Sequence, residues 1–314
     1  MRAVVFDGQL RFVESYQMRA GKPGEVAVDV IKAGICETDI QLCQGYMGFS
    51  GVLGHEFVGI ARNGKFAGQR VVGEINCACE ACELCRRQLG NHCPNRTVVG
   101  ILQHDGAFAD SVWIPEVNLH RVPDALSTEA AVFVEPVAAA CRIPQQIPDI
   151  KGQSVVVLGD GRLGNLCAQV LTHHGCSVTV VGKHLEKLRL LSNRGIATVL
   201  LQDFSPARSA DVVVDCTGSA SGLETALKAV RPCGTIVLKT TVAATQNIHM
   251  APFVIDEIRL LGSRCGPFAD AIQLLTEGAV DVAPLLSATY PIRDAIRAFE
   301  HATRKDTLKV LLDL

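Results

Sequence analysis

The chain has 314 residues, a length that suits two domains better than one. Hydrophobic residues make up 48% of the sequence and charged residues 20%, so the chain can bury a large core and is not disordered. A net charge of −2 provides no basic field for nucleic acid or anionic membranes, and no apolar run reaches the length of a membrane span or a signal core. We therefore expect a cytoplasmic protein without nucleic-acid or membrane partners.

The first 130 residues alternate short apolar runs with glycine-rich turns. The runs include Ala3–Phe6, Glu25–Ile31, Val58–Ala61, Gln69–Val72 and Ala107–Ile114. Alternation with a period of two between turn signals is typical of antiparallel strands. This part of the sequence therefore predicts an antiparallel β domain with few helices.

Four cysteines of this part lie within a single short loop. They are Cys79, Cys82, Cys85 and Cys93. Four thiolates are the number that closes a tetrahedral structural zinc site. A zinc ribbon that grips nucleic acid is the alternative, but few cations flank the cysteines and the chain is nearly neutral. The spacing therefore predicts a structural zinc.

A more dispersed set of possible zinc ligands lies upstream of this loop. It consists of Cys36 within Gly34–Asp39, and of His55 and Glu56 within Gly54–Gly59. A thiolate and an imidazole suit zinc, and a catalytic zinc takes three protein ligands and leaves one position open. Spacing alone does not establish such a site, because residues placed in this way are more often structural.

From Ser154 onward, short buried strands alternate with helices. The expected strands are Val155–Leu158, Val178–Val181, Val212–Asp215 and Thr235–Leu238, and the expected helices are Leu163–His174, Glu186–Arg194 and Gly222–Arg231. This alternation predicts a parallel sheet covered on both faces and an α/β fold. Two helices, Phe268–Glu277 and Ile292–Ala302, and a strand, Thr307–Leu312, are expected to complete the chain.

A dinucleotide-binding motif opens this second part. Gly159, Gly161 and Gly164 form GxGxxG between a strand and a helix, with Arg162 and Leu163 in between. The first glycine permits a tight turn, the second lets a pyrophosphate approach the backbone, and the third lets helix and strand pack closely. We expect these residues to contact the cofactor.

The choice of cofactor is read at the end of the second strand. NAD-binding sites place an acid there, whereas this chain has Gly182, Lys183 and His184. An acid would repel a 2′-phosphate, whereas Gly182 leaves room for it and Lys183 can pair with it, so the sequence favours NADP(H). An ordinary solvated turn is the alternative.

Together these segments resemble the zinc-dependent alcohol dehydrogenases of the medium-chain dehydrogenase/reductase family. The resemblance covers essentially the whole chain, and its segments are Gly34–Asp39, the GHE-x-x-G of Gly54–Gly59, the four-cysteine loop, Gly106–Ala109, the glycine turn, Asp215–Gly218 and Leu308–Val310. It implies a GroES-like antiparallel β catalytic domain, residues 1–136 and 264–314. It also implies a doubly wound parallel-sheet (Rossmann) nucleotide-binding domain, residues 137–263.

The resemblance also implies roles for individual residues. Cys36, His55 and Glu135 would hold the catalytic zinc, with Glu135 placed as in the polyol-dehydrogenase-like branch, although an acid in the first turn of a helix looks the same. Asp39 would orient His55, and Glu56 would lie behind the metal. Thr38 would relay the proton of the alcohol. Many relatives carry a histidine where this chain has Gln41, which cannot act as a base, so the resemblance leaves the exit of the proton unassigned.

For the cofactor, the resemblance adds Thr217, Arg264 and Lys309 as expected contacts, although the last two look equally like surface cations. The leading hypothesis is a zinc-dependent, NADP(H)-preferring alcohol or polyol dehydrogenase that acts on a small alcohol or its carbonyl. One alternative is an NAD-dependent amino-alcohol or sugar-alcohol dehydrogenase, similar to threonine or sorbitol dehydrogenase. The other is a non-catalytic cofactor-binding scaffold. We expect two zinc ions per chain and a homodimer or homotetramer.

Overall fold

The chain divides into two units in the computed structural model, which describes residues 1–239 and 248–314. Unit 1 comprises residues 1–135 and 282–314, and unit 2 comprises residues 136–281. The first boundary lies one residue from the expected one, but the second lies at 281/282 instead of 263/264. Asp281 contributes to this difference, because its N–H donates to Gln169 Oε1 at 2.7 Å and its carbonyl accepts from Gln169 Nε2 at 3.0 Å. These bonds tie the segment to the helix that follows the glycine turn.

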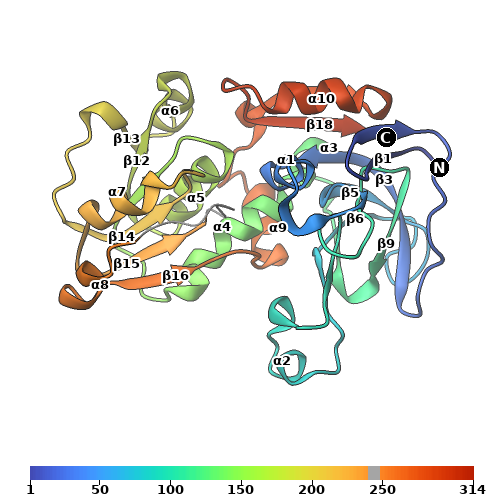
Figure 1. Ribbon diagram of the computed structural model, residues 1–314, viewed down its shortest axis with the longest axis horizontal. Helices are drawn as coiled ribbons and strands as arrows, with labels where there is room; N and C mark the ends of the chain where they lie inside the picture. Colours follow the sequence, from blue (N-terminus) through green and yellow to red (C-terminus); the bar gives the residue numbers. More distant parts are fainter. Residues whose placement is uncertain (240–247) are drawn as a thin grey trace. The chain divides into compact units, whose positions relative to one another are not determined.

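Unit 1 is built on a mainly antiparallel sheet with the strand order β10-β6-β5-β3-β18-β17, in which β9 also pairs with β3. Figure 1 labels β3, β5, β6, β9 and β18 of this sheet. Its strands are β3 (Glu25–Ile35), β5 (Glu56–Ala61), β6 (Arg70–Gly73), β9 (Ser111–Pro115), β10 (Leu119–Arg121), β17 (Leu286–Pro291) and β18 (Lys309–Asp313). A smaller sheet joins β1 (Ala3–Phe6), β2 (Leu10–Val13) and β4 (Gly51–Val52). The C-terminal strand β18 pairs with β3, which brings the end of the chain into the N-terminal unit.

Short helices and one projecting loop complete unit 1. The helices are α1 (Glu37–Cys43), α2 (Glu83–Arg86), α3 (Thr128–Val132) and α10 (Ala295–Ala302), the last preceded by a 3-10 turn at Ile292–Asp294. The four-cysteine loop runs between the paired strands β7 (Asn76–Cys77) and β8 (Thr97–Val98). In Figure 1 this loop, with α2, stands off from the sheet of unit 1.

Unit 2 contains a parallel six-stranded sheet with the order β13-β12-β11-β14-β15-β16. The strands are β11 (Ser154–Leu158), β12 (Ser177–Gly182), β13 (Ala197–Leu200), β14 (Ala210–Asp215), β15 (Val230–Leu238) and β16 (Arg259–Gly262). The helices are α4 (Val134–Gln146), which begins at the boundary, α5 (Arg162–His173), α6 (Leu185–Ser192), α7 (Ser221–Ala229), α8 (Ala251–Ile255) and α9 (Phe268–Thr276). Counted along the chain, this order is 3-2-1-4-5-6, that of doubly wound dinucleotide-binding sheets, and it confirms the expected fold class. Such sheets bind ligands where the order reverses, here at the carboxyl ends of β11 and β14.

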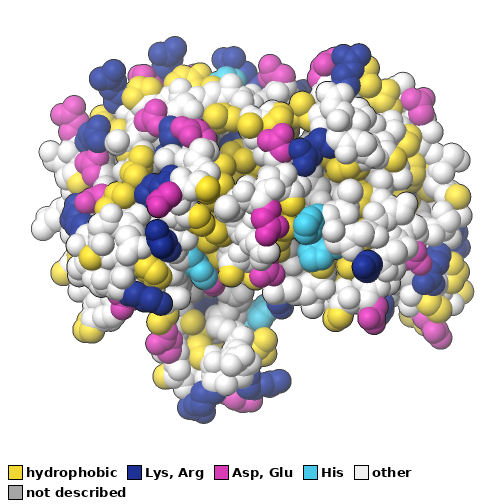
Figure 2. Space-filling model, turned by 180° about the vertical axis from the view of Figure 1, so that it is seen from behind, with side chains coloured by type: hydrophobic (Ala, Val, Ile, Leu, Met, Phe, Trp, Pro, Cys, Tyr) yellow, Lys and Arg dark blue, Asp and Glu magenta, His cyan; other side chains and the backbone are white. Residues whose placement is uncertain are grey.

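The surface agrees with the balanced composition. On the face shown in Figure 2, basic and acidic side chains are interspersed. Among the described helices, none combines the length and the apolar character needed to cross a membrane.

Candidate functional site

The four cysteines of the projecting loop converge on one point. The Sγ–Sγ distances are 3.4 Å for Cys82–Cys85, 3.4 Å for Cys79–Cys93, 3.8 Å for Cys82–Cys93 and 4.0 Å for Cys79–Cys85. Four sulfurs placed about 2.3 Å from a central zinc in a tetrahedron lie about 3.8 Å apart. The geometry therefore fits a structural zinc ion.

The protonation of these thiols agrees with a site made for a cation. Backbone N–H groups of Ala81 and Cys82 point at the sulfur of Cys79 and lower its pKa to about 6. Desolvation and the neighbouring sulfurs raise the pKa of Cys85 to about 12. Four thiolates cannot share so small a space without a positive ion, so metal binding must release the remaining protons.

A second group of possible ligands lies in the sheet of unit 1. Atoms of Cys36, His55 and Glu56 lie within 4.8 Å of one another. Cys36 follows β3 and caps α1, while Glu56 is the first residue of β5 and pairs with Gly34 of β3. The antiparallel pairing of these two strands thus brings together ligands that the sequence separates.

Asp39 ties the two ligand segments together. Its side chain is fully buried, and its Oδ2 accepts the Cys36 N–H at 2.8 Å while its Oδ1 accepts the Gly54 N–H at 3.1 Å. The same Oδ1 lies 3.4 Å from His55 Nδ1. Burial by itself lowers the pKa of His55, but the negative charges of Asp39 and Cys36 outweigh it and raise the pKa well above its usual value. The site therefore attracts positive charge.

Glu56 has a buried cationic neighbour, Lys309. Both side chains are almost completely buried, and Lys309 Nζ pairs with Glu56 Oε2 and donates to the Ile35 carbonyl at 3.3 Å. Burial lowers the pKa of Lys309 to about 8, although the charges of Cys36 and Asp39 act in the opposite direction. The lysine lies against Gly34, where an added Cβ would approach its Cε to 2.5 Å.

This position corrects one expectation for the cofactor. Lys309 was expected to contact a phosphate, but it is 0% exposed and its charge is engaged by Glu56 inside unit 1. The sequence could not indicate this burial, because the partner lies more than 250 residues away. Arg264 is exposed just after β16, and its role toward the cofactor stays a prediction.

Two other residues predicted for this site, Thr38 and Glu135, are not among the grouped possible ligands. Thr38 Oγ1 lies 3.8 Å from Cys36 Sγ, near enough to serve the same site. Glu135 is half-buried as the second residue of α4 and is not part of the group formed by Cys36, His55 and Glu56. Gln41 donates to Glu37 Oε1 at 2.9 Å, one turn earlier on α1.

The glycine turn of unit 2 has the backbone that its motif requires. Gly159 has a φ of +113°, and Gly161 caps the N-terminus of α5. A Cβ on Gly164 would overlap the Gly159 carbonyl, so only glycine lets α5 approach the turn this closely. Thr217, exposed after β14, bonds through its N–H and hydroxyl to Asp215 Oδ1, at 2.9 and 2.7 Å. It lies beside the turn, since a Cβ on Gly159 would be 3.3 Å from Thr217 N.

The second strand of the sheet ends at the predicted cofactor-selecting residues. Gly182 is buried at the end of β12, whereas Lys183 and His184 are exposed. The carboxylate of Asp160, inside the glycine turn, accepts hydrogen bonds from the N–H groups of both exposed residues. Asp160 was not predicted as a site residue, although an acid between two motif glycines was a visible signal.

Each unit matches a family model. Residues 22–124 match the alcohol dehydrogenase GroES-like domain, and residues 163–278 match the zinc-binding dehydrogenase domain. The chain belongs to the zinc-binding alcohol dehydrogenase family. This confirms the expected resemblance and the assignment as an NAD(P)-dependent zinc oxidoreductase.

Similar proteins span nearly the full length of the dehydrogenase. It is 28% identical over 302 residues to 2-dehydro-3-deoxy-L-galactonate 5-dehydrogenase from Pseudoalteromonas atlantica, covering 89% of this chain and 88% of that protein. It is 28% identical over 313 residues to sorbitol dehydrogenase from Halalkalibacterium halodurans, covering 92% and 91%. The crystal structure of a zinc-binding dehydrogenase from Sinorhizobium meliloti 1021 bound to NADP superposes with a TM-score of 0.89 at 26% identity, covering 100% and 99%.

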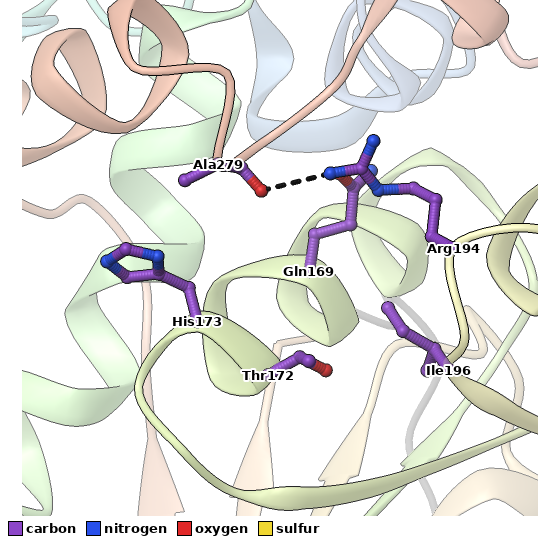
Figure 3. Close-up of a pocket in the computed structure, with 6 residues that line it drawn as sticks. All are labelled: Gln169, Thr172, His173, Arg194, Ile196 and Ala279. Carbon is purple, nitrogen blue, oxygen red and sulfur yellow. Dashed lines mark hydrogen bonds between the residues drawn. The ribbon is translucent and has the colours of Figure 1, made fainter.

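A small pocket in unit 2 of the dehydrogenase is separate from the glycine turn. It has a volume of about 140 Å³ and is lined by Gln169, Thr172, His173, Arg194, Ile196 and Ala279 (Figure 3). Figure 3 shows Arg194 reaching the Ala279 carbonyl, to which it donates at 3.2 Å. The pocket is smaller than a typical small-molecule site, which has a volume of about 300–1,000 Å³. The residues that α5 contributes to it come from the C-terminal half of this helix, whereas the glycine turn precedes its N-terminus. The pocket therefore does not coincide with the cofactor turn.

Proposed function

We propose that this dehydrogenase oxidises alcohols or polyols, or reduces the corresponding carbonyl compounds, with a catalytic zinc and NADP(H). The observation that carries the proposal is the group formed by half-buried Cys36 and buried His55 and Glu56, a donor set typical of zinc. The preference for NADP(H) is supported by Gly182 and by the exposed side chains of Lys183 and His184 after it. The similar Sinorhizobium structure, which holds NADP, points the same way.

Polyols are favoured as substrates by the relatives. Sorbitol is a polyol, and the Pseudoalteromonas enzyme is named for a hydroxylated sugar acid. A substrate with neighbouring hydroxyl groups is therefore the first class to test. An NAD-dependent sugar-alcohol dehydrogenase is the second candidate, and the sorbitol dehydrogenase relative supports its substrate class.

The residues of unit 1 fit a bound zinc ion. Glu56 Oε1 is buried without a hydrogen-bond partner, a costly arrangement that a cation would relieve. When bound, zinc supplies Lewis-acid chemistry that polarises the oxygen of an alcohol or a carbonyl. Cys36 and His55 would hold it, and Asp39 fixes both segments. Thr38 places a hydroxyl beside Cys36, where it can accept the proton of an alcohol substrate and pass it on.

A substrate panel tests the proposed function directly. Short alcohols, polyols and amino alcohols are each oxidised with NADP and with NAD, and the zinc content of the same sample is measured. We expect activity on polyols, tighter binding of NADP than of NAD, and two zinc ions per chain. Tighter binding of NAD would contradict the cofactor preference, and activity confined to amino alcohols would contradict the substrate class.

Two glutamates compete for the third protein position on the catalytic zinc. The family resemblance predicts Glu135, whereas the grouped atoms favour Glu56. We propose Glu56, and we expect Glu56→Gln to weaken zinc affinity by at least the factor of about 10–100 that loss of a residue hydrogen-bonded to a ligand already causes. Glu135→Gln, the matched control, should leave zinc affinity unchanged, as measured by competition with a chromogenic chelator. The reverse order of effects would restore Glu135 as the ligand.

We propose that the Thr38 hydroxyl carries the substrate proton. Thr38→Val keeps the shape of the side chain and removes the hydroxyl, so we expect kcat to fall about 100-fold or more at unchanged zinc content. Thr38→Ser, which keeps the hydroxyl, should retain most of the activity. Steady-state rates across pH measure both variants, and unchanged turnover in the valine variant would remove Thr38 from the relay.

We propose a homodimer or homotetramer that uses the outer strand of unit 2. Among the described strands, β16 ends the sheet, and Leu260 on it is 44% exposed. Nearby on α8, Val254 and Ile255 are 76% and 77% exposed, so an apolar surface adjoins this edge of the described sheet. We expect Leu260→Lys with Ile255→Glu to yield a smaller assembly in light scattering after gel filtration. An unchanged molar mass would contradict this interface.

A further inference from the structure

The glycine turn contains a carboxylate that its motif does not require. Asp160 lies between Gly159 and Gly161 and is 8% exposed. Its Oδ2 accepts the N–H of Lys183 at 2.7 Å and that of His184 at 2.5 Å. The Nδ1 of His184 lies 3.1 Å from the same oxygen. The carboxylate of the glycine turn is thus hydrogen-bonded to the backbone that directly follows β12.

Asp160 and a side chain at position 182 exclude each other. A Cβ on Gly182 would lie 2.5 Å from Asp160 Cβ and 2.6 Å from Asp160 Oδ2. In NAD-binding sites, an acidic residue at the end of this strand binds the ribose of the cofactor. Here that space is filled by a carboxylate from the adjacent turn, and only 10% of this side chain is exposed.

The hydrogen bonds of Asp160 orient the residues that follow β12. Two successive N–H groups point inward to one carboxylate oxygen, and both side chains, of Lys183 and His184, are exposed. A bare carboxylate beside a 2′-phosphate would repel it. Two N–H donors and an imidazole partly offset the charge of Asp160, so the cation of Lys183 remains available to an anion.

We propose that Asp160 is a positioning residue for cofactor selection: by fixing the main chain of Lys183 and His184, it holds these side chains where the 2′-phosphate of NADP(H) binds. The proposal rests on the proposed preference for NADP(H). Asp160 acts through the turn and makes no contact with the phosphate itself. Replacing Asp160 should therefore have no effect on the affinity for NADP(H) once Lys183 and His184 have themselves been replaced.

A double-mutant cycle tests this coupling. The dissociation constants of NADPH, NADH and adenosine 2′,5′-bisphosphate are measured by calorimetry for the wild type, Asp160→Ala, Lys183→Met/His184→Gln and the triple variant. We expect Asp160→Ala to weaken NADPH and the bisphosphate about tenfold and to change NADH much less. Added to the Lys183→Met/His184→Gln background, it should have no further effect on NADPH. Asp149→Ala, at an exposed aspartate of the same unit, is the control, and circular dichroism checks folding.

The outcomes separate this inference from the proposed function. Wild-type protein that binds NADH more tightly than NADPH contradicts the proposed preference, whatever Asp160 does. Equal weakening of both cofactors by Asp160→Ala overturns the inference, because Asp160 would then support only the glycine turn. Tighter binding of NADPH by this variant overturns it too, because the carboxylate would then act as the acid that rejects a 2′-phosphate.

Discussion

Cys36→Ser is expected to reduce the bound zinc from two ions per chain to one and to lower kcat/KM about 1,000-fold or more. A cysteine thiol loses its proton and binds zinc as a thiolate, whereas a serine hydroxyl stays protonated. Serine is therefore a poor replacement for cysteine as a zinc ligand. Zinc is counted by mass spectrometry of the metal, and rates are measured with the best polyol. The loss should be confined to one ion because the projecting loop keeps its own four sulfurs.

Cys233→Ser is the matched control for this prediction. Cys233 is exposed in unit 2 and lies outside both groups of possible ligands, so its replacement should leave zinc content and rate unchanged. A Cys36→Ser protein that still holds two zinc ions and turns over normally would place the catalytic metal elsewhere.

The second large effect is expected from the projecting loop. Cys85→Ser should release the structural zinc and unfold the loop, because the four-residue helix α2 is too short to be stable alone. Arg87, whose side chain is already 63% exposed, should then become a site of rapid tryptic cleavage. The strand pair β7–β8 closes the base of the loop, so the sheet of unit 1 should stay folded.

Limited proteolysis with mass spectrometry of the fragments measures this effect, and thermal unfolding with and without a chelator accompanies it. The wild type treated with a strong chelator should show the same cleavage as the variant. Cys77→Ser serves as a nearby control, since Cys77 is buried in β7 and is not one of the four converging cysteines. Resistance of the Cys85→Ser loop to trypsin would show that its fold does not depend on the metal.

Features that depend on nearby residues could be predicted from the sequence. The four cysteines share one loop, so their spacing was enough to predict the cluster that the sulfur distances show. The glycine turn was equally local, and Gly159 and Gly164 have the backbone and packing that the motif implies. The parallel sheet also followed, because its strands are short, continuous apolar runs.

Features that depend on distant pairing could not be predicted in the same way. The boundary near Asp281 is set by hydrogen bonds to Gln169, more than 100 residues earlier. Lys309 looked like a surface cation because no residue near it in the sequence indicates that its ion-pair partner, Glu56, is buried in the core. Helix α7 ends at Ala229, two residues before its predicted end, because Val230 already pairs with Ala210 of β14.

The contact between Gly34 and Lys309 links two positions at opposite ends of the gene. Any side chain at position 34 would collide with the stem of the lysine, and shortening position 309 would leave the acid beneath it unmatched and a void beside β3. Neither residue can therefore be replaced alone without destabilising the core of unit 1. A larger side chain at position 34 requires a shorter one at position 309, and the shorter side chain in turn requires a neutral residue in place of Glu56.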